Sequence, residues 1–239
     1  MTSSKKSIGI ICPEKTSFNY CQRVLSLENE EEIKGRDITY GEIGDYNIFS
    51  IYSGTGKIKT AAATQLLIDK YNPDLIIDSG KSTSLADEIN MSSIIVGLRV
   101  YEYDVFSTAQ IEEIPEEYIT ETDLNNEEIM TEVKEYINSK RDYGNILLGN
   151  IACGERKIDN RIFCELLHSK FDSLVSTWES AAALQVAKIN NIKRLSLRVV
   201  MTKLSPRTGE RVSGSQKEGY RKLYNLVKDM IIDKVVGKI

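Results

Sequence analysis

Short apolar runs alternate with amphipathic segments along the whole chain. The apolar runs have the length and the β-branched content of buried strands, which are predicted at 7–12, 46–52, 74–79, 93–100, 144–153, 174–175 and 194–201. Apolar residues recur at helical spacing between these runs, as Phe18, Cys21 and Leu25 do. Further helices are predicted around 130–137, 162–167, 178–189 and 220–231. This alternation predicts an α/β protein whose mixed or parallel sheet is covered by helices.

A glycine-containing turn is predicted to lead into the second helix. SGTGK at 53–57 follows a predicted hairpin, 37–52, whose turn contains Gly44 and Asp45. Pro73 is predicted to end the helix, because proline cannot donate the next backbone hydrogen bond. The helix face expected to point toward the core consists of Ile58, Ala61, Ala62 and Leu66.

Two polar segments interrupt the pattern. Residues 106–126 are acidic and aperiodic, and 202–216 are rich in Ser, Gly and Arg. Both are predicted to be loops, the second of them mobile. No internal repeat marks a domain boundary. We therefore predict a single domain over residues 1–239, a three-layer α/β architecture in which a central mixed β-sheet is flanked by helices.

Composition and charge narrow the class of partner. Of the 239 residues 41% are hydrophobic and 28% are charged, as in ordinary globular proteins. A formal charge of -4 leaves no basic surplus to neutralise phosphates, so a small molecule is expected rather than nucleic acid. No run approaches the length of a membrane-spanning helix, and the apolar stretch near the start is too short for a signal peptide. We expect a cytoplasmic protein with no membrane partner.

The residues that usually bind metals are sparse. Four cysteines without Cys-x-x-Cys spacing and a single histidine, His168, make no recognisable zinc set. We interpret the cysteines as reduced and mostly buried, and His168 as a histidine on a helix surface or at a helix end. No metal and no cofactor are predicted.

Several segments, taken in order, resemble the nucleoside phosphorylase and nucleosidase superfamily, and within it the 5′-methylthioadenosine/S-adenosylhomocysteine nucleosidases. They are IGII at 8–11, SGTGKIKTAAATQLLIDKYNPDLIIDSG at 53–80, GNIACGERKI at 149–158, STWESAAALQVA at 176–187 and LRVV at 197–200. The long second segment follows the family's glycine loop, alanine-rich helix and strand in order and spacing. The resemblance implies the phosphorylase-like fold and a purine nucleoside as ligand.

The resemblance also implies which residues contact that ligand. They are Gly54, Gly80, Lys81, Lys157, Ile158, Thr177, Trp178, Glu179 and Arg198. Glu179 corresponds to the glutamate that binds the ribose hydroxyls, although Ser176 and Glu179 also have the spacing of a helix capping box. Trp178 stands where the family has methionine, and it packs either on the sugar or in the core. Arg198 is either a ligand contact or half of a structural ion pair.

The catalytic positions depart from the family pattern. Thr202 occupies the position of the aspartate that meets the base, and a threonine cannot deliver a proton near neutral pH. The carboxylate expected near the first strand aligns without a gap to Ser17, while Glu14 lies close by but out of register. The catalytic candidates are therefore Glu14, Glu179 and Thr202, and either Glu14 reaches the site or it is an exposed loop carboxylate.

Three functions remain open at this stage. One is hydrolysis of a purine nucleoside with a 5′-thio substituent, and another is a catalytically impaired nucleoside-binding protein. The third is phosphorolysis, with SGTGK, Lys81 and Arg198 as an anion site. Lys81 and Lys157 either favour an anionic ligand or merely face solvent. The resemblance and the aromatic segment GLRVYEYDVF at 97–106 predict a homodimer.

Overall fold

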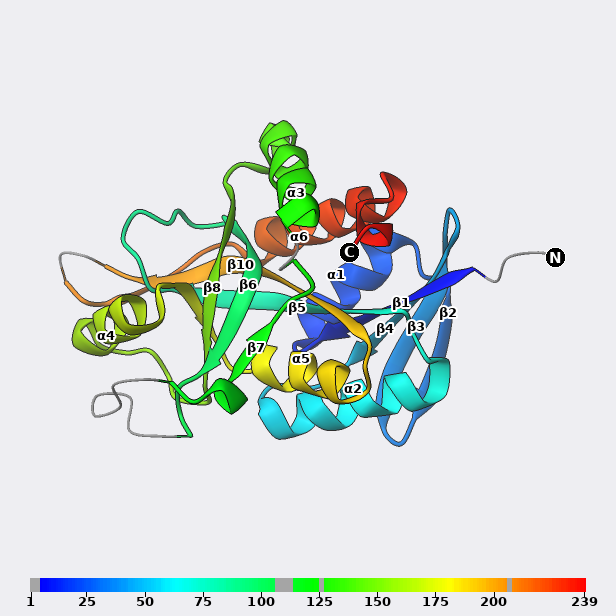
Figure 1. Cartoon of the computed structure of the whole chain (residues 1–239), viewed down its shortest axis with the longest axis horizontal. Coiled ribbons are helices and arrows are strands. Elements are labelled where there is room, and N and C mark those ends of the chain that lie inside the picture. Colours follow the sequence, from blue (N-terminus) through cyan, green and yellow to red (C-terminus); the bar gives the residue numbers. More distant parts are fainter. Residues whose placement is uncertain (1–4, 106–113, 125–126, 206–207) are drawn as a thin grey trace.

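The computed structural model describes residues 5–105, 114–124, 127–205 and 208–239. One mixed sheet runs through this part of the chain (Figure 1). Its strands are β1 (Lys6–Cys12), β2 (Asn29–Ile33), β3 (Arg36–Ile43), β4 (Tyr46–Tyr52), β5 (Leu75–Ser84), β6 (Ile94–Glu102), β7 (Ile119–Glu121), β8 (Ile146–Cys153), β9 (Ser173–Thr177), β10 (Lys193–Leu204) and β11 (Arg211–Ser213). No helix in the described residues is long and apolar enough to cross a membrane.

The sheet folds back on itself at one end. Its strand order is β11-β10-β6-β8-β9-β5-β1-β4-β3-β2, and β10 also pairs with β5. The strands β5, β9, β8, β6 and β10 therefore form a closed ring, while β1 to β4 extend from it as an open sheet. Each strand in the series β4-β1-β5-β10 runs parallel to the next one. The carboxyl ends of these four strands therefore meet at one edge of the sheet. In open α/β sheets, ligands bind at such an edge.

Helices cover both faces of the sheet. They are α1 (Lys15–Leu25), α2 (Lys57–Tyr71), α3 (Glu127–Ser139), α4 (Arg161–Phe171), α5 (Ser180–Ile189) and α6 (Gln216–Ile232), with short 3₁₀ turns at Glu116–Tyr118, Arg141–Tyr143 and Val235–Gly237. Figure 1 shows α1, α3 and α6 on one side and α2 and α5 on the other. The three-layer α/β architecture with a central mixed sheet is thus confirmed.

Strand β1 explains why both layers are needed. Ile8, Ile10 and Cys12 pack with the core beneath α1 and α6, while Ile11 packs with the core beneath α2. Gly9 faces α2, and a Cβ at that position would lie 2.5 Å from Leu67. A strand that is apolar on both faces is stable only when both faces are covered.

The buried face of α2 differs from the face predicted from the sequence. Its buried residues are Thr60, Ala63, Thr64, Leu67 and Ile68. Ile58, which was predicted to face the core, is 82% exposed. The predicted face was wrong because α2 carries alanines on several sides, so hydrophobicity alone does not select the face that meets β1 and α5.

The predicted loops contain further strands. In 106–126 the described residues include β7, which pairs with β6, and the rest of that segment lies partly outside the described residues. In 202–216, β10 continues to Leu204 and β11 pairs with it. The strand β2 was also missed, since NEEEI carries too few apolar residues to indicate a strand. β5 runs on through Gly80 to Ser84 instead of ending before that glycine.

Candidate active site

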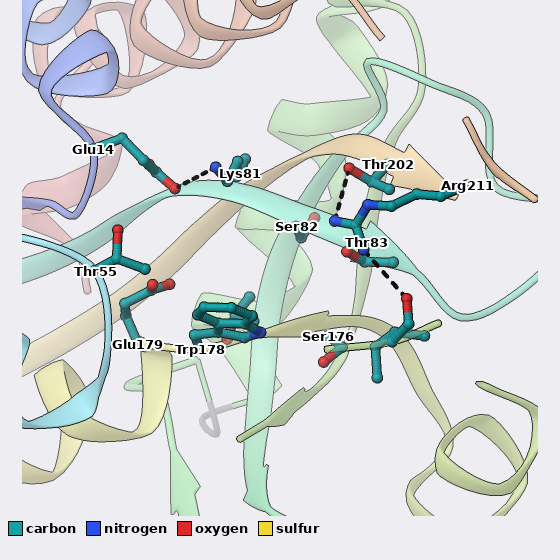
Figure 2. A pocket seen from close by; sticks show the side chains of 12 residues that line it. Glu14, Thr55, Lys81, Ser82, Thr83, Ser176, Trp178, Glu179, Thr202 and Arg211 are labelled. Atoms are coloured by element: carbon teal, nitrogen blue, oxygen red, sulfur yellow. Dashed lines mark hydrogen bonds and ion pairs between the residues drawn. The ribbon is translucent and has the colours of Figure 1, made fainter. Parts of the chain in front are cut away.

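A pocket of about 580 Å³, including its open mouth, lies at the edge where the parallel strands end. Its lining residues come from the ends of β1, β5, β9 and β10, from β11, and from the loops after β4 and β8. They are Glu14, Thr55, Lys81, Ser82, Thr83, Ile158, Ser176, Thr177, Trp178, Glu179, Thr202 and Arg211 (Figure 2).

Glu179 lies at the start of α5 with its side chain buried in the pocket wall. Its Oε1 accepts a hydrogen bond from the Gly56 backbone at 3.3 Å, and its Oε2 lies 3.5 Å from Nη1 of Arg198. The side chain makes no capping bond to its own helix, which begins at Ser180. The capping-box interpretation was therefore wrong, because the glutamate turns away from α5 toward the glycine loop.

The environment of Glu179 favours its protonated form. Burial raises the pKa of this carboxyl to about 7, and the nearby carboxylates of Glu14 and Asp78 raise it as well, while Arg198 opposes them. The side chain is only 3% exposed. A carboxyl that titrates near neutral pH in a pocket is a candidate functional group.

Arg198 lies behind Glu179, outside the pocket lining, and is fully buried. Its guanidinium forms an ion pair with Asp78, which is also fully buried, and Nε donates to Asp78 Oδ2 at 3.0 Å. Ser196 donates to the same carboxylate at 2.7 Å. Arg198 thus belongs to a buried ion pair that also holds one oxygen of Glu179, so its contact with a ligand would be indirect.

Glu14 reaches the pocket although it is out of register with the family carboxylate. It lies at the start of α1 with a side chain that is 14% exposed. The hydroxyl of Tyr220 donates to its Oε2 at 3.1 Å, and Nζ of Lys81 lies 3.3 Å from its Oε1. Ser17, which aligns with that carboxylate, is buried and bonds to Tyr224 instead. The interpretation of Glu14 as an exposed loop carboxylate was wrong.

Gly80 permits this approach of charged groups to β5. Its φ is +146°, and a Cβ there would lie 2.8 Å from Nη1 of Arg198 and 3.4 Å from Oε2 of Glu14. A side chain would therefore displace the guanidinium or the carboxylate. Gly54, with φ of +80°, shapes the loop before α2 but does not line the pocket.

Thr202 and Arg211 form the wall opposite Glu14. The pairing of β10 with β5 shifts register between Val200 and Thr202, and such a bulge re-aims a side chain. Nη2 of Arg211 donates to Oγ1 of Thr202 at 3.4 Å, and its Nη1 donates to the Ile158 carbonyl at 3.2 Å. Figure 2 shows the guanidinium between these two groups.

The other implied contacts divide between the pocket and its surroundings. Ile158, Thr177 and Trp178 line the pocket, and Trp178 remains 38% exposed at its wall. Lys81 lines it too, but as the ion-pair partner of Glu14. Lys157 is exposed and lies outside the lining, so the structure does not bring it to the site.

Sequence reasoning missed the hydroxyl residues Thr55, Ser82, Thr83 and Ser176, and it missed Arg211. Thr55 lies in the glycine loop and Ser82 and Thr83 follow Gly80, so their places soon after the strand ends predicted from the sequence were the available signal. Arg211 had no such signal, because only the pairing of β11 with β10 brings it to Thr202.

The described residues contain no group of three or more His, Cys, Asp or Glu side chains placed to hold a metal ion. His168 lies on the half-buried surface of α4, and Nδ1 contacts the Ser173 carbonyl at 2.9 Å.

Comparison with known proteins agrees with this geometry. The model of the phosphorylase superfamily matches residues 8–232. A 5′-methylthioadenosine/S-adenosylhomocysteine nucleosidase from Buchnera aphidicola is 28% identical over 200 residues, which cover 81% of this chain and 83% of the relative. The nucleosidase of the same name from Bacillus subtilis is 28% identical over 169 residues, covering 67% and 71%.

Solved structures share the fold at lower identity. The same nucleosidase from Helicobacter pylori, complexed with a substituted pyrrolidin-3-ol, has a TM-score of 0.80 at 18% identity and covers 97% of this chain and 100% of its own. The futalosine hydrolase of Helicobacter pylori has a TM-score of 0.79 at 19% identity and covers 96% and 98%. At these identities the structures establish the architecture.

Proposed function

Since this chain belongs to the phosphorylase superfamily, we propose that its pocket binds purine nucleosides and is built for hydrolysis of their N-glycosidic bond. The names of its relatives suggest 5′-methylthioadenosine and S-adenosylhomocysteine as the first ligands to test. The observation that carries the proposal is the pair of carboxylates, Glu14 and Glu179, that line one pocket. Each has a separate set of partners, which supports two separate roles.

Glu179 is the proposed ribose ligand. An ionised carboxylate accepts hydrogen bonds from two neighbouring hydroxyls at once. Gly56 and Arg198 hold the carboxylate of Glu179 from behind. This positioning leaves the ligand side of Glu179 available to the sugar.

Glu14 is the proposed base. In hydrolysis, a water oxygen bonds to the anomeric carbon as the bond from that carbon to the purine nitrogen breaks. Glu14 takes one proton from the water, and the electrons of the broken bond leave with the purine, which gains its proton from solvent. Tyr220 and Lys81 orient Glu14 for this role. A positioned general base contributes roughly 10²–10⁴ in rate.

For adenosine derivatives, the departure of the purine is the step that this pocket assists least. Thr202 occupies the position of the acid, and its hydroxyl donates a hydrogen bond but does not protonate the purine. This deficit supports slow turnover of 5′-methylthioadenosine, or the alternative of a nucleoside-binding protein with impaired catalysis. Lys81 and Arg198 already pair with carboxylates, and the Gly56 N–H binds Glu179, which favours hydrolysis over phosphorolysis.

Restoring the acid tests this proposal. An aspartate introduced at Thr202 would lie beside Arg211, which would lower its pKa and weaken it as an acid, so the variant combines Thr202→Asp with Arg211→Leu. We expect turnover of 5′-methylthioadenosine to rise by up to roughly 10²–10⁴, the range of a general acid. The control combines Thr202→Asn with Arg211→Leu and should gain nothing. In the restored variant, Glu14→Gln should remove most of the gain.

Three results would count against parts of the proposal. Wild-type turnover of about 1–10³ s⁻¹ would contradict the missing acid. Equal activity with glutamine at position 14 would exclude Glu14 as the base. Absence of nucleoside binding by calorimetry would reject the nucleosidase assignment.

A further inference from the structure

The wall around Thr202 carries one strong hydrogen-bond donor, the guanidinium of Arg211. Arg211 has five N–H donors and no acceptor, and two of them reach Thr202 and the Ile158 carbonyl. The Ile158 carbonyl already accepts from Arg211 at 3.2 Å. The Thr202 oxygen likewise accepts from Arg211, so its own proton is free to point toward a ligand.

The opposite wall fixes which part of a nucleoside lies here. Glu14 and Glu179 lie together at the other side of the pocket, since the carboxylate of Glu14 raises the pKa of Glu179 and both carboxyl groups act on the nearby guanidinium of Arg198. Figure 2 shows Thr202 and Arg211 across the pocket from Glu179, so a purine whose ribose binds Glu179 would extend toward them. The edge of the purine that meets this wall must therefore satisfy donors.

The two common classes of purine differ at that edge. A 6-oxopurine presents two acceptors, O6 and N7, at the spacing of a guanidinium fork, whereas a 6-aminopurine presents N7 and an amino donor. The amino group would face Arg211, which cannot accept a hydrogen bond. The amino group would leave its hydrogen bonds with water and find no acceptor on Arg211, so its burial there would cost free energy.

We propose that Arg211 makes this pocket selective for nucleosides of 6-oxopurines and contacts the O6 and N7 atoms of the base. This inference rests on the proposed function, because it takes a nucleoside as the ligand. Donors directed at O6 and N7 also stabilise the negative charge that the purine acquires as it leaves. Arg211 would thereby compensate for the acid that Thr202 lacks.

A matched pair of ligands tests the inference by calorimetry. 5′-Methylthioinosine and 5′-methylthioadenosine differ only at position 6 of the base. We expect the wild type to bind the inosine derivative about 10-fold more tightly or better, as a bidentate arginine contact discriminates between bases. Arg211→Met should bring the ratio of the two affinities close to one, and Arg211→Lys should lose most of the preference because lysine lacks the planar fork.

The controls separate this inference from the function on which it rests. The matched control is Arg221→Met, because Arg221 is exposed on α6 and does not line the pocket. This variant should keep the wild-type ratio of the two affinities. Glu179→Gln should weaken both ligands equally. If both ligands bind through Glu179 with equal affinity, or if Arg211→Met leaves the preference intact, the inference about Arg211 is wrong. If neither ligand binds, or Glu179→Gln changes neither affinity, the proposed function fails together with it.

Discussion

At the scale of single residues, Glu179 shows how burial can prepare a carboxyl for a ligand. Its pKa of about 7 lies well above the ordinary range for glutamate, chiefly because burial disfavours the charge. The buried Arg198 limits that shift, since its guanidinium attracts the ionised form. A ligand that donates two hydrogen bonds would favour the ionised form further.

Nucleoside affinity should therefore depend on pH through Glu179. As the pH rises from about 5 to 7, the carboxyl loses its proton, and we expect the affinity to increase by up to about tenfold per pH unit and then level off. Calorimetric titration across this range measures the profile. Glu179→Gln should bind about 1–3 kcal/mol more weakly and show no such slope. A slope that persists in the variant would assign the titration to another group.

Stability should change in the opposite direction over the same window. Because the folded-state pKa of Glu179 is raised, the folded protein binds more protons than the unfolded chain between about pH 4.5 and 7. The free energy of unfolding contributed by this group therefore falls as the pH rises, by at most about 3 kcal/mol. Denaturant unfolding of the wild type and of Glu179→Gln distinguishes this effect from altered binding.

At the scale of elements, α2 shows where hydrophobic patterning is insufficient. This helix starts directly after the glycine loop, and the backbone N–H of its N-cap residue Gly56 donates to Glu179, so the placement of the helix also affects the site. Leu67 meets the gap that Gly9 leaves on β1. Packing against that glycine selects the buried face among several apolar or small faces.

Two substitutions in α2 test this corrected face. Leu67 is fully buried, so Leu67→Ala should reduce the free energy of unfolding by about 2–5 kcal/mol. Ile58→Ala serves as the comparison and should change it by less than about 0.5 kcal/mol, since that side chain is 82% exposed. Equilibrium urea unfolding gives both values. Similar losses in both variants would contradict the orientation of α2.

At the scale of the whole molecule, the proposed homodimer has lost part of its original basis. Tyr101 and Tyr103, which contribute to the aromatic segment 97–106, are buried within the chain. Tyr101 stacks on Phe171, and Tyr103 packs edge-on against Phe163. Val105 is 41% exposed, while Phe106 lies outside the described residues.

A homodimer nevertheless remains a prediction, because the sequence resemblance implies it. Sedimentation at micromolar concentration should give twice the chain mass of 27.0 kDa. Val105→Asp would place a charge on the exposed part of the segment and should shift the population toward the monomer if this segment forms the interface. A single species of 27.0 kDa in the wild type would reject the dimer.

The order and period of apolar residues specified the layers of this protein. Apolar runs such as 7–12 indicated strands buried on both faces, and the motif around Glu179 pointed to residues that line the pocket. These features are local, since they depend on the order and period of neighbouring residues. Only the tertiary structure decided that Glu14 turns into the pocket, that Arg198 is held by Asp78, and that Arg211 reaches Thr202. Those contacts join residues far apart in the chain, so their geometry depends on strand pairing and helix packing that no local pattern contains.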